Sequence, residues 1–144
     1  MKIFLDADAC PVTDIIIETA KEKEIKLILV KNYTQIIEDE YPEIVTVDIS
    51  HASADFYIIN RLKDNDLVIT NDKGLSALAI SRNRYVMDFF GNIINEKNID
   101  LYLNMRHINA VNRKRGIYSK NRKRSLADNS NFKKNLLLLL EEIK

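Results

Sequence analysis

The stretch KIFLDADACP, residues 2–11, decides the fold. A short apolar run leads into Asp6 and Asp8, and Pro11 follows where a helix can begin, because its fixed φ suits the first helical position. Open α/β sheets bind their ligands at such junctions of strand and helix. Side chains alternate along a strand, so Asp6 and Asp8 can point to the same side. Two carboxylates this close would repel each other unless a cation lay between them, and a metal site is therefore the first hypothesis.

Four more short runs rich in Ile, Val and Leu resemble the one at residues 3–5, namely 27–30, 44–47, 67–70 and 85–87. Parallel strands that are buried on both faces have this composition. Helical patterns occur at residues 11–23, 52–63, 73–81, 99–113 and 129–143, whereas residues 31–42 have no clear period and are expected to be an irregular connection. This alternation predicts a three-layer α/β/α sandwich with a mainly parallel sheet of about five strands.

The length of 144 residues fits one domain over 1–144, which includes a basic loop at 113–124 and the helix at 129–143. The single cysteine, Cys10, cannot form an internal disulfide, and no signal-peptide pattern precedes it, so we expect a cytoplasmic protein. The longest apolar run, Leu136 to Leu140, is far shorter than the ~20 residues that cross a bilayer, and no contact with a membrane is expected. This run predicts a packing helix, and its five leucines could also serve a homodimer interface.

The two parts of the chain differ in charge. Residues 1–104 contain 11 Lys and Arg against 18 Asp and Glu, a net charge of −7, and residues 105–144 contain 11 against 3, a net charge of +8. An acidic body with a basic end favours a polyanionic partner held near a carboxylate site. The alternative is that the two parts neutralise each other.

Two further acids are expected near Asp6 and Asp8. Asp72 follows the apolar run 67–70, at the same edge of the predicted sheet, although an N-cap of the next helix would also explain it. Asp55 shares a helical stripe with apolar residues and should face inward, where an unpaired charge is costly. A first-turn acid stabilised by the helix dipole is the alternative for Asp55.

Four carboxylates, Asp6, Asp8, Asp55 and Asp72, would make an oxygen-only site suited to Mg²⁺ or Mn²⁺. Such an ion can hold a phosphate oxygen and activate water. The predicted chemistry is phosphodiester hydrolysis.

The basic segment 113–124 contains seven positive charges and no negative one. It could neutralise phosphates without reading sequence, and its tyrosine could stack on an unpaired base, which favours single-stranded RNA as the partner. A solvated surface loop is the alternative. The candidate nucleic-acid contacts are Lys73, Arg106, Arg113, Lys114, Arg115, Tyr118, Lys120, Arg122, Lys123 and Arg124.

Other activities fit parts of this pattern. Asp6 and Asp8 after a strand also match the nucleophile and the acid/base of a phosphatase of the haloacid dehalogenase type, which needs a later lysine, and Lys73 is the one available. A non-catalytic RNA-binding module could retain the fold without turnover. A nucleophilic Cys10 at a helix start is less favoured, because no histidine pairs with it in the pattern.

Three segments resemble the bacterial YaiI/YqxD family: DADACPV at 6–12, Ala54-Asp55, and DLVITND at 66–72, which Gly74-Leu75 and Ala77-Leu78-Ala79 follow. The resemblance continues through Asn98-Ile99 and Arg106 to the final helix. The family is similar to PIN-like (NYN/PIN) nucleases, and the resemblance implies a Mg²⁺- or Mn²⁺-dependent nuclease whose motif acids are Asp6, Asp8, Asp55 and Asp72. One departure is the stretch Lys120-Asn121-Arg122-Lys123, where relatives carry a Gly-Pro-Lys type of turn.

Overall fold

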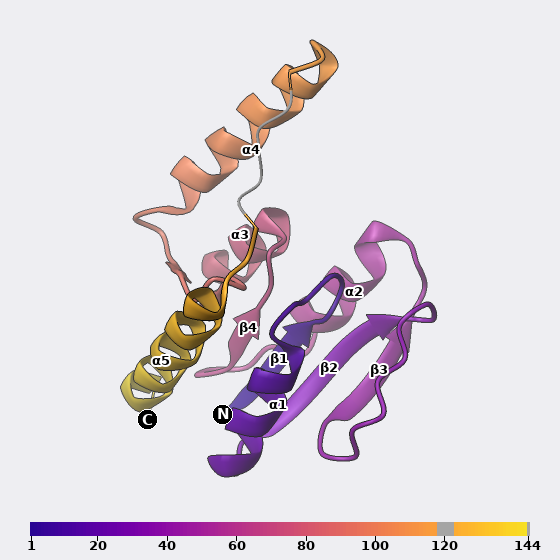
Figure 1. Cartoon of the computed structure of the whole chain (residues 1–144), viewed down its shortest axis with the longest axis vertical. Coiled ribbons are helices and arrows are strands. Elements are labelled where there is room, and N and C mark those ends of the chain that lie inside the picture. Colours follow the sequence, from indigo (N-terminus) through magenta and orange to yellow (C-terminus); the bar gives the residue numbers. More distant parts are fainter. Residues whose placement is uncertain (118–122, 144) are drawn as a thin grey trace.

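The strands of the predicted sheet form where the apolar runs occur. The computed structural model describes residues 1–117 and 123–143 (Figure 1). Its elements, in chain order, are β1 (Lys2–Asp6), α1 (Thr13–Glu22), β2 (Lys26–Asn32), β3 (Glu43–Val47), α2 (His51–Ile59), β4 (Leu67–Ile69), α3 (Lys73–Ser81), β5 (Tyr85–Met87), β6 (Ile93–Ile94), α4 (Ile99–Lys114) and α5 (Leu126–Ile143).

The sheet has the strand order β3-β2-β1-β4-β5-β6. The first five strands are parallel, and β6 pairs with β5 in the antiparallel direction. The prediction of a mainly parallel sheet is confirmed, and β6 is the strand that the sequence pattern missed because only two residues form it. β1 lies between β2 and β4, so its carboxyl end is flanked by the ends of two other strands.

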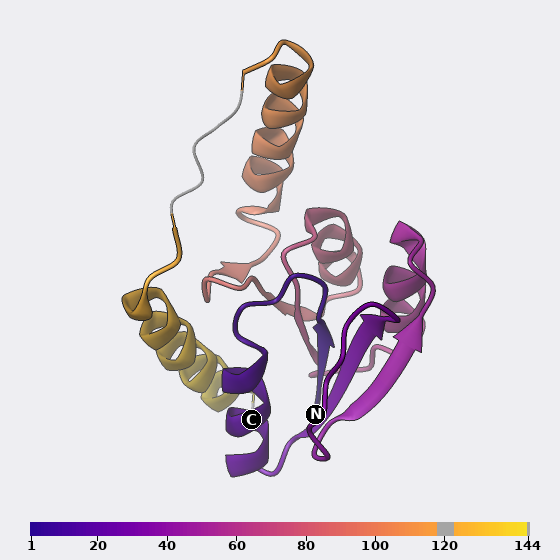
Figure 2. The same ribbon diagram turned by 45° about the vertical axis from the view of Figure 1, so that its right-hand side comes forward.

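Alternate residues of each strand enter two separate cores. Ile3 and Leu5 of β1 pack on one face of the sheet with α1 and α5, and Phe4 packs on the other face with α2, α3 and α4. Both faces of the sheet are therefore covered by helices, as Figure 2 shows, and the predicted three-layer sandwich is confirmed. This arrangement leaves the carboxyl ends of the strands as the place for a site.

The first helix begins two residues later than the proline signal predicts. Residues 7–12 form a turn in which the Cys10 amide donates to the Ala7 carbonyl at 3.2 Å and Ala9 has a φ of 54°. The helix starts at Thr13 because this turn must first bring the chain back toward the sheet. Asp8 therefore lies in a turn and not on the strand.

The helix α4 extends away from the sheet (Figures 1 and 2). It packs beside α3, and Ile99 at its first position is its one buried residue among those that the structure describes. Within the same described ranges, no helix is both long and apolar enough to cross a bilayer.

Candidate functional site

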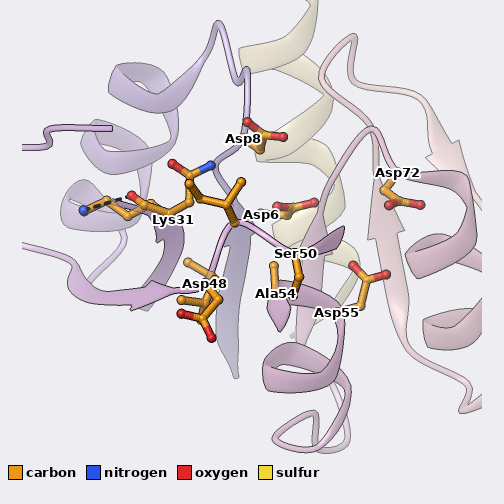
Figure 3. A pocket seen from close by; sticks show the side chains of 12 residues that line it. Asp6, Asp8, Lys31, Asp48, Ser50, Ala54, Asp55 and Asp72 are labelled. Carbon is orange, nitrogen blue, oxygen red and sulfur yellow. Dashed lines mark hydrogen bonds between the residues drawn. The ribbon is translucent and has the colours of Figure 1, made fainter. Parts of the chain in front are cut away.

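All four predicted acids line one pocket at the carboxyl ends of the strands. Asp6 ends β1, Asp8 lies in the turn after it, Asp55 belongs to α2, and Asp72 precedes α3 (Figure 3). The other described residues that line this pocket are Val30, Lys31, Asn32, Val47, Asp48, Ile49, Ser50 and Ala54. With Asp48, five carboxylates therefore line one opening, from the end of β1, the segment after β3, α2 and the start of α3.

Asp6 lies at the centre of this group in Figure 3. Burial is the main reason that its pKa is raised above the ordinary value, and the negative charges of Asp72 and Asp8 raise it further. The Thr70 hydroxyl donates to Asp6 Oδ2 at 2.9 Å, which works in the opposite direction because it favours the ionised carboxylate. The charges of the three carboxylates therefore interact across the pocket.

Asp72 is the N-cap of α3, as the alternative explanation of its position predicts. Its Oδ1 accepts from the amides of Gly74 at 2.8 Å and Leu75 at 3.2 Å. Its own amide donates to the Thr70 hydroxyl at 3.0 Å. Thr70 consequently bonds to both Asp72 and Asp6 and fixes the two strand ends relative to each other. A capping role and a metal role are compatible, because both capping bonds use the same carboxylate oxygen.

The chemistry of these donors suits Mg²⁺ or Mn²⁺, because all four are hard carboxylate oxygens. Their present spacing is too wide: within residues 1–117 and 123–143, no group of three or more Asp, Glu, His and Cys side chains is placed to hold one ion. Binding an ion here would require the side chains to move toward one another. Burial, and after it the charges of Asp72 and Asp8, raises the pKa of Asp6, and a bound cation would favour the ionised carboxylate against both effects.

The opposite wall of the pocket comes from β2 and the segment after β3. Of the described residues that line the pocket, Lys31 is the one with a cationic side chain, and its Nζ donates to the Asn32 carbonyl at 3.3 Å. Asp48 accepts a hydrogen bond from the Tyr33 hydroxyl. The sequence interpretation did not single out Lys31, Asn32, Ser50 or Thr70. The rule that sites form at strand ends could have found Lys31 and Asn32, because they end β2.

Lys73, a predicted phosphate contact, does not line this pocket. Its Nζ lies 3.7 Å from Asp88 Oδ2 and 4.7 Å from the centre of the Tyr102 ring. Asp88 is buried and also accepts from the amides of Phe90 and Asn92, both at 2.9 Å. Burial, and then the charge of Asp88, raises the pKa of Tyr102. In this structure Lys73 therefore joins α3 to the loop after β5 and to α4.

The remaining basic residues lie outside the pocket. A Cβ built on Gly74 would come within 3.1 Å of Asp72 Oδ1 and 3.3 Å of Arg106 Nη1, so Arg106 lies beside the start of α3. The basic residues at the end of α4, Arg113, Lys114 and Arg115, are exposed and do not line the pocket. The predicted contacts Tyr118, Lys120 and Arg122 fall outside the described residues.

Two of the basic residues follow the segment that is not described. Lys123 is exposed. Arg124 Nε donates to Asn129 Oδ1 at 2.6 Å, and its guanidinium lies 4.9 Å from the centre of the Phe90 ring. Arg124 thus holds the start of α5 against the loop after β5.

Cys10 does not have the surroundings of a nucleophilic cysteine. Burial is the largest effect on its thiol and raises the pKa above the ordinary value, and a hydrogen bond with Thr13 opposes this only in part. A reactive cysteine needs the opposite shift, toward the thiolate. The burial of the thiol agrees with treating Cys10 as a packing residue.

The strand order and the carboxylates at the strand ends define an α/β protein with an acidic pocket at the carboxyl edge of its sheet. Residues 4–142 match a family described as "Uncharacterized BCR, YaiI/YqxD family". The chain is 40% identical to the "UPF0178 protein" of Alkaliphilus oremlandii, over 99% of this chain and 92% of the relative. It is 39% identical to the "UPF0178 protein" of Natranaerobius thermophilus, over 100% of this chain and 99% of the relative. No solved structure matches the chain significantly. The chain belongs to the YaiI/YqxD family.

Proposed function

We propose that this protein is a Mg²⁺- or Mn²⁺-dependent nuclease of the PIN-like type that hydrolyses phosphodiester bonds, with single-stranded RNA as the favoured substrate. One observation carries the proposal: five carboxylates, the four predicted acids and Asp48, line one pocket at the carboxyl ends of the parallel strands. Repulsion within such a group of carboxylates destabilises the folded state unless a cation balances it, and groups of this kind are typical of functional sites. A cytoplasmic location, expected for a chain with one cysteine, belongs to the same proposal.

Asp6, Asp8, Asp55 and Asp72 are the residues that would hold the ion. When bound, a divalent ion of this kind lowers the pKa of a water molecule and neutralises charge on a phosphate. Thr70 holds Asp6 and Asp72 in register, because its hydroxyl bonds to both residues. The amides of Gly74 and Leu75 keep the Asp72 side chain at the start of α3.

The charge of the pocket also bears on the substrate. A phosphodiester would be repelled by the four carboxylates alone, so binding of a polyanion here requires a cation. Basic residues outside the pocket, such as Arg106 beside α3 and the group at the end of α4, can hold the rest of a nucleic-acid chain without contacting the cleaved bond. In this proposal the acidic pocket binds the ion and the cleaved phosphodiester, and the basic residues outside it hold the rest of the nucleic-acid chain.

The test is to measure cleavage of single-stranded RNA in Mn²⁺ by the variants Asp6→Asn and Asp72→Asn. We expect both to lose at least about 100-fold in rate, because each removes a negative ligand of the ion. Asparagine is also a good N-cap, so Asp72→Asn should keep α3 intact. The matched control is Asp14→Asn, which changes an exposed acid in the first turn of α1 and should cleave like the unchanged protein. Full activity in Asp6→Asn would reject the assigned site.

A phosphatase with Asp6 as nucleophile is the second candidate, and the hydrogen bond from Thr70 to Asp6 favours it. Such a mechanism needs a lysine beside the aspartate. Lys73 contacts Asp88 and Tyr102 instead, and Lys31 on the opposite wall bonds to the Asn32 carbonyl. Trapping of BeF₃⁻ on Asp6 would support the phosphatase over the nuclease. RNA binding that falls with salt, without any cleavage in Mn²⁺, would support a binding module instead.

A further inference from the structure

The helix α4 is apolar on two opposite faces. Ile99 is buried, and Tyr102 and Leu103 pack with it against the core on the side of α2 and α3. On the other face, Leu101, Met105 and Ile108 are 62%, 53% and 49% exposed. Their spacing of four and three residues places them in one row along the helix, which we call the outer stripe.

The outer stripe is not expected to stay exposed to water. Surface helices normally turn polar side chains toward solvent, whereas α4 turns the apolar outer stripe toward it. An isolated helix of 16 residues is also marginal in water without packing. The helix extends away from the sheet in both views of Figures 1 and 2, so the body of the domain supports only its beginning. A partner that covers the outer stripe would stabilise the rest.

We infer that the partner is a second copy of this chain, with the two α4 helices paired in antiparallel orientation about a two-fold axis. Asp100 lies in the first turn of α4, and Arg113 and Lys114 lie in the last turn. Antiparallel pairing places the acidic turn of each copy at the level of the basic turn of the other. Parallel pairing would place the two basic turns side by side, which is unfavourable.

The sequence of the stripe fits this symmetry. An axis that passes between Met105 and Ile108 sets Met105 of each copy opposite Ile108 of the other. Leu101 then faces the level of Asn112, the polar residue that continues the row. A single polar residue in an apolar seam is a known means of fixing helix register.

The outer face of α5 is the competing surface, but it exposes fewer apolar side chains than α4 does. Three of the five leucines at 136–140 are buried in the core, which leaves Leu138, 58% exposed, and the partly covered Leu137. Lys133, Lys134 and Glu141 border the groove beside them, so this face offers one well-exposed leucine of the run, whereas α4 offers three exposed apolar side chains. The dimer that the leucine run suggested is therefore assigned to α4 instead.

The association should be weak. Three side chains per copy cover less than the roughly 800 Å² per partner of a standard interface. We therefore expect a dimer that forms over micromolar to millimolar concentrations and not an obligate one.

The experiment measures the mass of the full chain by sedimentation over a range of concentrations up to roughly 1 mM. The unchanged protein should shift from monomer to dimer, and Met105→Lys should weaken this dimer at least about tenfold. Leu138→Lys is the matched control, with the same change at a similarly exposed position on α5, and it should dimerise normally. Circular dichroism of each variant verifies that the fold is retained. A monomer at every concentration, or a dimer lost only in Leu138→Lys, would overturn the inference.

A second set of variants tests the orientation. Arg113→Glu with Lys114→Glu should weaken the dimer, since the new acids then lie at the level of the partner's Asp100. Adding Asp100→Lys should restore it, because the two ends of the helix again have opposite charge. Restoration is not expected from a parallel pair, so its absence would contradict the antiparallel arrangement. None of these variants changes a residue that lines the acidic pocket, and the mass is measured without RNA, so the result does not depend on the nuclease proposal.

Discussion

Asp6 illustrates the conflict between stability and function at the scale of a single residue. It ends a buried strand, and the charges of Asp8 and Asp72 act on it across the pocket. The hydrogen bond from Thr70 offsets only part of the cost of keeping it ionised. A residue selected for stability alone would be neutral here, so the carboxylate marks a position where charge has a purpose.

The raised pKa of Asp6 predicts how Asp6→Asn changes stability with pH. A carboxyl whose pKa is raised on folding binds its proton more tightly in the folded state, so its contribution to stability is lost as the pH rises from the ordinary value of 3.8 through the folded pKa. At neutral pH and without metal, Asp6→Asn should therefore have a higher Tm than the unchanged protein. The two should converge at a pH below 3.8, where both side chains are neutral.

Saturating Mn²⁺ should reverse this order of stability, because the unchanged protein would gain more from binding the ion. Thermal melts across pH, with and without Mn²⁺, provide the measurement. The control is Asp14→Asn, which should show no such reversal. A lower Tm of Asp6→Asn at neutral pH without metal would contradict the assigned cost of the charge.

At the scale of elements, Lys73 connects three pieces of the structure. Its ammonium lies between Asp88, in the loop after β5, and the ring of Tyr102 on α4. The lysine follows Asp72 directly in the sequence, and this adjacency suggested a phosphate contact. Successive residues on a helix point about 100° apart, however, so neighbours in sequence face different surroundings. Here Asp72 faces the pocket and Lys73 faces α4.

This connection predicts that Lys73→Met destabilises the fold. The apolar stem would keep its contact with Tyr102, but the buried Asp88 would lose its cation, at a cost of about 1–3 kcal/mol. Asp88→Asn in the same chain should recover part of this loss, and a double-mutant cycle in urea measures the coupling. The affinity of the protein for RNA should stay unchanged in Lys73→Met. A stable variant with weakened RNA binding would instead favour the phosphate contact.

The strands and helices can be predicted from the sequence, but not all of the contacts between their residues. The five parallel strands, Asp6, Asp8 and Asp72 were predictable, because apolar runs of strand length lead into these acids and parallel strands place their ends at one edge. Asp55 was predictable for another reason, since it shares a helical stripe with apolar residues. The role of Thr70 was not, because its hydrogen bond to Asp6 depends on β1 lying beside β4. The exposed row on α4 was hidden as well, since an apolar residue in a helix pattern is ordinarily assigned to the core.

At the scale of the whole molecule, opposite charges are separated along the chain and in space. The acidic pocket lies at the strand ends, whereas the basic end of α4 projects away from the sheet (Figure 1). This separation argues against simple neutralisation of one part by the other within the described residues. A long polyanion could contact the basic end and still reach the pocket, because nucleic-acid backbones carry charge along their whole length.

The salt dependence of RNA binding tests this division of tasks. Each phosphate contact with a single strand contributes about 0.7 to the slope of log K against log salt, so Arg113→Ala with Lys114→Ala should reduce that slope by about 1.4. Lys21→Ala with Lys23→Ala removes two equally exposed charges at the end of α1 and should leave the slope unchanged. Binding is measured in Asp6→Asn, without cleavage, by anisotropy of a labelled single strand. If both pairs reduced the slope equally, the attraction would come from net charge, and α4 would have no special part in holding the RNA.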